Sequence, residues 1–150
     1  MKIAVACDHA GFPLKARVIE TLQKAGHTVI DLGTNSTDPV DYPDYAFAAA
    51  RAVLEGRAER AVLICGSGAG ACVAANKFCG IRAATCHDSF SARQCVGDDD
   101  VNVLCLGARV IGPELAVDLV RDYVGAQFSG AERHRRRLSK IATFEADFGK

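Results

Sequence analysis

Short apolar runs alternate with helix-like segments along the chain, and this alternation restricts its fold more than any other feature. The runs are rich in Val, Ile, Leu and Ala, as in buried strands, and the segments between them have helical composition. Several of these segments end at Gly or begin at Pro, as helices do. The expected strands are 2–7, 27–31, 61–65, 81–86 and 102–106, and the expected helices are 12–25, 44–54, 68–78, 88–96, 113–124 and 132–147.

Strands that alternate with helices pair in parallel, because the connection between parallel neighbours needs a crossover that is usually a helix. We therefore expect an α/β fold with a five-stranded, doubly wound parallel sheet, helices on both faces and an extra C-terminal helix. The 150 residues fit one domain, 1–150, that is long enough to bury a substantial core. In such sheets, ligands bind at the carboxyl ends of the strands.

Composition narrows the possible partners. The chain has 18 basic and 18 acidic residues, so its net charge gives no reason to expect nucleic-acid or membrane binding.

Because no apolar stretch is long enough for a signal peptide or a membrane span, we expect a cytoplasmic protein. The 7 cysteines include no CxxC pair, and most lie in strand-like or helical contexts. We expect reduced thiols and no metal.

Residues 62–77, VLICGSGAGACVAANK, predict a strand, a glycine-rich turn and the start of a helix. Such a turn lets a ligand approach the main chain and directs successive N–H groups at an anionic atom. Cys65 lies where the strand ends, so its sulfur is expected to face the same place. The hypothesis is that anion binding and nucleophile or base chemistry meet here; the structural alternative is a buried strand-end thiol.

A set of motifs extends this interpretation over nearly the whole chain. They are CDHAGF, DYPDYA, ICGSGAGACVAANK, GIRAATC, NVLCLGAR and ERHRRR, in that order. Together they resemble the ribose-5-phosphate isomerase B family, which includes the galactose-6-phosphate isomerase subunits. The resemblance implies a Rossmann-like three-layer αβα sandwich and a homodimer, with further pairing into tetramers left open. It also implies an active site at the subunit interface and an aldose–ketose isomerisation that uses neither metal nor cofactor.

The resemblance implies specific catalytic roles in the glycine-rich turn. The family's base is a cysteine at the place of Cys65 or, in another subgroup, a glutamate at the place of Ala71, so this chain matches the cysteine subgroup. Main-chain N–H groups nearby favour the thiolate and would stabilise an enediolate oxygen, as in an oxyanion hole. The residues expected to form this anion hole are Gly66, Ser67, Gly68, Ala69 and Gly70, with the Ser67 hydroxyl also catalytic.

Further residues are expected to hold the sugar phosphate. The resemblance implies that Asp8 and His9 contact the sugar hydroxyls and the phosphate side of the ligand; the structural alternative is a helix cap with a surface histidine. It also implies that Tyr42 lines the site; the structural alternative is that Tyr42 packs its loop onto the sheet. Arginine suits phosphate because its planar guanidinium can donate two parallel hydrogen bonds to phosphate oxygens and stays charged at any working pH. The candidates are Arg109, Arg133 and Arg137, with His134 in addition, some of them from the partner subunit. The alternatives for this basic run are a solvated face or, disfavoured by the neutral charge, a nucleic-acid patch.

One segment departs from the family pattern. Before NVL the family usually has a histidine, followed by Asn or Asp, assigned to opening the sugar ring; here Asp98 and Asp99 occupy these places. A carboxylate is a better base than acid at neutral pH, so ring opening by Asp98 is a hypothesis, and the acidic run alternatively caps a loop. The change also suits a shorter or already acyclic substrate.

The expected function is therefore interconversion of ribose 5-phosphate and ribulose 5-phosphate through an enediolate, with Cys65 as base. Two alternatives stay open: an isomerase of a tetrose or hexose phosphate, and a phosphosugar-binding module that has lost catalysis. A dinucleotide-binding site is disfavoured, because the glycine motif follows the third expected strand rather than the first.

Overall fold

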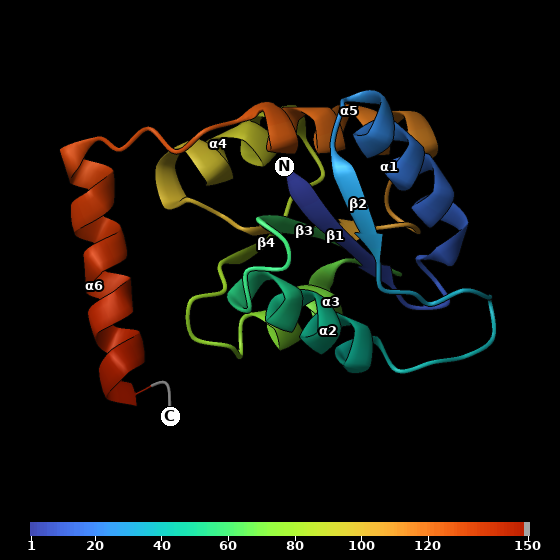
Figure 1. The fold of residues 1–150 in the computed structure, drawn as a ribbon, viewed down its shortest axis with the longest axis horizontal. Helices are drawn as coiled ribbons and strands as arrows, with labels where there is room; N and C mark the ends of the chain where they lie inside the picture. The colour runs from blue at the N-terminus through green and yellow to red at the C-terminus, as the bar shows by residue number, and fades with distance from the viewer. Residues whose placement is uncertain (149–150) are drawn as a thin grey trace.

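The computed structural model describes residues 1–148 and contains a five-stranded, all-parallel sheet with helices on both faces (Figure 1). The strand order is β2-β1-β3-β5-β4. This confirms the expected three-layer α/β sandwich. The strands are β1 (Lys2–Cys7), β2 (Thr28–Asp31), β3 (Arg60–Cys65), β4 (Ala83–Thr85) and β5 (Val103–Gly107), and the helices are α1 (Phe12–Lys24), α2 (Tyr42–Leu54), α3 (Ala69–Ala75), α4 (Ser89–Asp99), α5 (Pro113–Gly125) and α6 (Glu132–Phe148).

Each face of the sheet has its own core, because successive strand side chains point to opposite faces. Ile3 and Val5 of β1 pack with α1, α4 and α5, whereas Ala4 and Ala6 pack with α2 and α3. Figure 1 shows the first group of helices above the sheet and the second below it. The α2–α3 side is rich in alanine, and these small side chains let both helices lie close to the strands.

Some element boundaries differ from those expected. α2 begins at Tyr42 with Asp41 as its N-cap, whereas Asp44, the expected cap, lies in the first turn. Pro43 explains the earlier start, since proline fits the first turn of a helix. The strand expected over 81–86 is only Ala83–Thr85. It starts late because the Ile81 N–H donates to the Phe78 carbonyl and the Arg82 N–H to the Asn102 side chain.

The last helix, α6, stands at the β4 edge of the sandwich and touches the body mainly through α4 (Figure 1). His134 is its buried residue. Three large apolar side chains of α6 are exposed: Ile141, Phe144 and Phe148. None of the helices within residues 1–148 is both long and apolar enough to cross a membrane.

The chain passes from β1 to β2 on one side of β1 and then to β3 on the other. This reversal of direction leaves an open crevice between the carboxyl ends of β1 and β3, the usual ligand position in open α/β sheets. β1 leads into Asp8 and His9, and β3 ends at Cys65. The topology therefore brings together residues that are more than fifty positions apart in the chain.

Candidate active site

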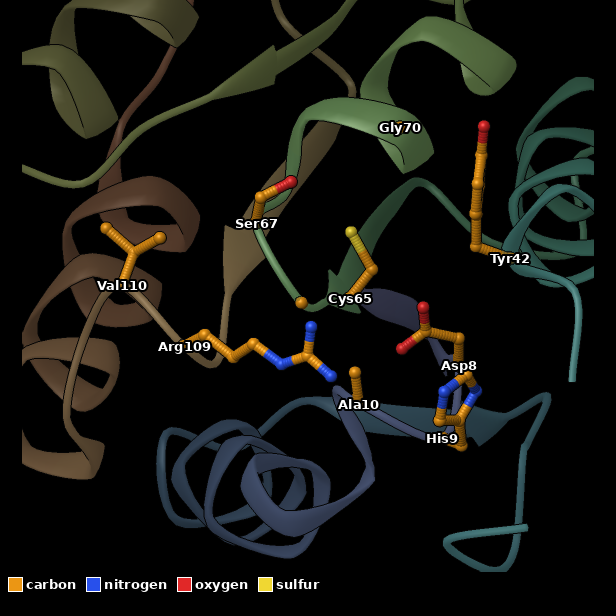
Figure 2. Close-up of a pocket in the computed structure, with 10 residues that line it drawn as sticks. Asp8, His9, Ala10, Tyr42, Cys65, Ser67, Gly70, Arg109 and Val110 are labelled. Carbon is orange, nitrogen blue, oxygen red and sulfur yellow. The ribbon is translucent and has the colours of Figure 1, made fainter. Parts of the chain in front are cut away.

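A pocket of about 320 Å³ occupies the crevice between β1 and β3 (Figure 2). It opens at the carboxyl ends of the strands, where the topology predicts a ligand. Most of the expected site residues of the first two-thirds of the chain meet in it. The lining residues are Asp8, His9, Ala10, Tyr42, Cys65, Gly66, Ser67, Gly70, Arg109 and Val110.

Cys65 is the only thiol in this pocket lining, and its side chain is buried. The Gly68 N–H donates to Cys65 Sγ at 3.1 Å, and Figure 2 shows the sulfur directed into the pocket between Ser67 and Tyr42. Gly68 has φ +84, and a Cβ there would lie 2.9 Å from Thr85 Cγ2. Only glycine can therefore direct this N–H at the sulfur.

The end of β5 packs against the glycine-rich turn. Gly107, at the end of β5, approaches Ser67 so closely that a Cβ on it would lie 2.6 Å from the Ser67 carbonyl carbon. The Gly107 N–H donates to His87 Nε2 at 3.0 Å. His87, for which the sequence suggested no role, therefore fixes the strand end against which the turn packs.

Asp8 and His9 line the pocket and also fix the local backbone. Asp8 is buried, and its Oδ1 accepts the Gly11 N–H at 2.8 Å, which stabilises the turn before α1. The N-cap of α1 is Gly11 and has no side-chain cap bond, so Asp8 is not the helix cap that was the structural alternative. His9 Nδ1 accepts the Val40 N–H at 3.2 Å. The same Nδ1 also lies 3.2 Å from the Val40 carbonyl oxygen, so this ring nitrogen contacts the backbone of Val40 in either tautomer.

Tyr42 and Arg109 come from different layers of the fold and meet at the same pocket. The Tyr42 ring lies over Gly70, where a Cβ would come within 2.9 Å of it. Tyr42 therefore packs against the glycine-rich turn and also lines the pocket. Arg109 is exposed and follows β5, and Figure 2 shows its guanidinium directed toward Ala10. Among residues 1–148, no carboxylate pairs with this guanidinium, which leaves it open to an anion.

The remaining expected site residues lie outside this pocket lining. Two of them are in the glycine-rich turn: the Gly68 N–H donates to Cys65 Sγ and the Ala69 N–H to Ser67 Oγ, whereas both were expected to face an anion. Asp98 and Asp99 are on α4, whereas Arg133 and Arg137 are exposed on α6. Asp98 Oδ2 accepts a hydrogen bond from Gln94 Nε2 at 2.8 Å, and its Oδ1 lies 3.5 Å from His134 Nδ1. Figure 1 shows α6 at the β4 edge, away from the β1–β3 crevice. The two helices are joined by the contact between Asp98 and His134, and we call Asp98, Asp99, Arg133 and Arg137 together the second cluster.

His134 occupies a structural position beside that cluster. Its side chain is only 2% exposed, and its Nδ1 lies 2.8 Å from Ser129 Oγ. These contacts tie α6 to the segment before it and to α4. His134 is therefore not presented to a phosphate, unlike the exposed Arg133 and Arg137 on the same helix.

The thiol of Cys72 has a lowered pKa. The side-chain hydrogen bond with Cys105, with further bonds from Thr85 and Asn76, lowers the pKa of Cys72 to about 6 although burial opposes the shift. Cys72 is half-buried on α3 and is not among the residues that line the pocket. An ionisable thiol is thus present on α3, the helix that follows the glycine-rich turn, and experiments on thiol reactivity must distinguish Cys72 from Cys65.

Within residues 1–148, no group of three or more His, Cys, Asp or Glu side chains is arranged to hold a metal ion. The pocket instead combines a thiol, a turn rich in main-chain N–H groups and an unpaired arginine. This fold and site define a class of α/β protein that binds a small anionic ligand beside a nucleophilic or basic thiol.

Comparisons with known proteins identify the family. Residues 3–141 match the model of the ribose/galactose isomerase family. The chain is 46% identical to ribose-5-phosphate isomerase B of Escherichia coli strain K12, with 96% of each chain covered. It is 42% identical to the D-erythrulose-4-phosphate isomerase of Pectobacterium atrosepticum, with 97% of this chain and 95% of the relative covered.

Solved structures agree with this result. Clostridium thermocellum ribose-5-phosphate isomerase B superposes with a TM-score of 0.96 at 44% identity, with 99% of each chain covered. The Mycoplasma genitalium enzyme with bound ribulose 5-phosphate gives a TM-score of 0.92 at 38% identity, with 97% of each chain covered. The chain belongs to the ribose/galactose isomerase family, as its motifs predicted.

Proposed function

We propose that this chain, as a single domain, interconverts ribose 5-phosphate and ribulose 5-phosphate, in the cytoplasm and without a cofactor. Its full-length similarity to ribose-5-phosphate isomerase B of Escherichia coli supports this substrate pair. The observation that carries the proposal is the position of Cys65 Sγ, which faces the pocket and accepts the Gly68 N–H. Arg109 at the same pocket supplies a cation for the phosphate.

The proposed reaction moves one carbon-bound proton. The Cys65 thiolate takes the proton from C2 of the open-chain aldose, and the electrons of that bond form a C1–C2 double bond while O1 becomes negative. Main-chain N–H groups of the turn stabilise this enediolate oxygen. The proton on O2 then passes to O1 through the hydroxyl of Ser67, a residue that lines the pocket, and the thiol returns a proton to C1 to give the ketose.

We further infer that the second cluster completes the site of another subunit. Asp98, Asp99, Arg133 and Arg137 lie outside the pocket lining of their own chain. The α6 helix that carries both arginines projects from the body and exposes Ile141 and Phe144. A homodimer that buries these side chains would bring the partner's arginines to the phosphate; pairing of such dimers into tetramers stays open.

This arrangement predicts complementation between two inactive variants. If Cys65 and Arg137 act in the same site but come from different chains, mixing Cys65→Ala with Arg137→Ala chains restores one intact site in each mixed dimer. Random exchange then gives about one quarter of the wild-type activity. Native mass spectrometry confirms that the mixed dimers form. Mixed dimers that show no activity would contradict the assignment of Arg137 to the partner's site.

A tetrose phosphate is a second candidate substrate, favoured by two observations. The chain is 42% identical to a D-erythrulose-4-phosphate isomerase, and Asp98 stands where the family usually has its ring-opening histidine. A tetrose 4-phosphate cannot close a furanose ring, because its terminal oxygen carries the phosphate. An enzyme for this substrate would need no ring-opening group.

Comparing the two substrates tests both proposals. We expect ketose formation from ribose 5-phosphate, and we expect Asp98→His to raise its kcat/KM by about tenfold, less than the roughly 10²–10⁴-fold that a fully positioned general acid or base contributes. Turnover of tetrose 4-phosphate, which has no ring to open, should be unchanged by Asp98→His. A chain that isomerises only tetrose 4-phosphate would replace the first proposal with the second. Binding without turnover of either sugar would instead indicate a non-catalytic phosphosugar-binding module.

A further inference from the structure

Lys15 of α1 is a buried lysine that the proposed reaction does not use. Its side chain is 7% exposed, and its Nζ lies within hydrogen-bond distance of acceptors from three residues. The distances are 2.9 Å to Asp31 Oδ2, 2.6 Å to the Thr34 carbonyl and 3.0 Å to Asn35 Oδ1. Lysine is rarely buried unless it is paired, so this position is fully engaged.

Asp31 is the last residue of β2, whereas Thr34 and Asn35 belong to the start of residues 32–41, the segment that connects β2 to α2 and that we call the β2–α2 loop. Asp31 Oδ1 also accepts the Gly33 N–H at 2.9 Å. Backbone bonds join Gly33 and Thr34 to Cys7, the residue before Asp8. Lys15 therefore connects α1, the end of β2 and the start of the loop in one network.

The other end of the loop reaches the candidate active site. His9 Nδ1 accepts the Val40 N–H at 3.2 Å, and two residues later the chain enters α2 at Tyr42. Both His9 and Tyr42 line the pocket with Cys65. The loop is thus fixed at its start by Lys15 and at its end by His9, and its path decides where His9 and Tyr42 lie.

A stability role alone accounts poorly for this lysine. Removing a buried ion from water is costly, and an apolar side chain of similar volume often gives equal or greater stability. The charge does give directional bonds to a carboxylate, a carbonyl and an amide oxygen, which define one loop geometry. We propose that Lys15 is a positioning residue, which fixes the β2–α2 loop and through it places His9 and Tyr42 against the substrate.

The test compares Lys15→Met with Lys24→Met. Both substitutions remove a lysine charge from α1, but Lys24 is exposed and pairs only with Glu20 within the described chain. For Lys15→Met we expect faster amide hydrogen exchange over residues 33–41 and no change over 62–77. This readout needs no catalytic activity, so it tests the inference even if the proposed function fails.

The kinetic arm rests on the proposed isomerase function. Lys15→Met should raise KM for the sugar phosphate about tenfold, the effect of losing roughly one substrate hydrogen bond, with a smaller change in kcat. A purely structural lysine would reduce the folded fraction, which lowers the apparent kcat and leaves KM unchanged. Asn35→Ala removes one of the contacts without leaving an unpaired charge, and it should shift KM and loop exchange in the same direction by a smaller factor.

Two results would overturn the inference. One is loop exchange in Lys15→Met and Asn35→Ala that matches Lys24→Met. The other is a faster-exchanging loop combined with wild-type KM in an active enzyme, which would show that the loop does not position the site. If Lys15→Met does not fold, Asn35→Ala alone decides between these results.

Discussion

Replacing Cys65 by alanine is expected to lower kcat for the isomerisation by about a thousandfold, within the range of general acid–base catalysis. The reason is that Cys65 is the only thiol in the pocket lining and its Sγ is held by the Gly68 N–H at 3.1 Å. Phosphosugar binding should stay largely intact, since the turn and Arg109 are unchanged. Steady-state kinetics and calorimetric titration with ribose 5-phosphate measure the two effects separately.

Cys72→Ala is the matched control for this variant. Cys72 lies on α3 after the same turn, and its thiol has a pKa lowered to about 6, which makes it the obvious competitor for the role of base. Since its side chain does not line the pocket, we expect kcat within about twofold of wild type. Full activity in Cys65→Ala together with an inactive Cys72→Ala would transfer the role of base to Cys72.

Replacing Gly107 by alanine is the second change with a large expected effect. The added Cβ would lie 2.6 Å from the carbonyl carbon of Ser67, so either β5 or the glycine-rich turn must shift. Overpacking of this kind costs about 1–3 kcal/mol of stability. Because displacement of catalytic groups by about 1 Å can cost 10²-fold in rate, we expect kcat/KM to fall by about a hundredfold in a chain that still folds.

Gly125→Ala is the control for Gly107→Ala. Gly125 is the last residue of α5, and a Cβ there meets nothing within 4 Å. Alanine is a better helix former than glycine, so the free energy of unfolding should stay equal or rise by up to about 1 kcal/mol, with unchanged activity. Thermal unfolding followed by circular dichroism and the isomerase assay measure both variants. A Gly107→Ala chain with wild-type kcat/KM would show that the contact with Ser67 does not position the turn.

Much of the fold follows from local patterns in the sequence. The apolar run at Lys2–Cys7 matches β1 residue for residue, because a fully buried parallel strand has a continuous apolar signature. The prediction was least accurate where side chains replace backbone pairing. Asn102 accepts the Arg82 N–H, which a longer β4 would use, and this competition depends on a contact between residues twenty positions apart.

The sequence likewise predicted only part of the candidate site. Cys65 and the turn after it were predictable because strand, turn and base are contiguous in the sequence. Lys15 and His87 were given no role, since each acts on a residue about twenty positions away that only the folded chain brings near. Asp98 and Arg137 were predicted from family motifs, and their placement on α4 and α6 outside the pocket lining is information that no local pattern contains.

The most direct test of the central claim is an NMR measurement of ribose 5-phosphate turned over in deuterated water. The account predicts that ribulose 5-phosphate forms and carries solvent deuterium at C1, because the Cys65 thiol exchanges its proton with water between removal from C2 and return to C1. The Cys65→Ala chain should give neither product nor exchange at C2. Ribulose 5-phosphate formed with no deuterium at C1, or by Cys65→Ala at the wild-type rate, would contradict an enediolate route through Cys65.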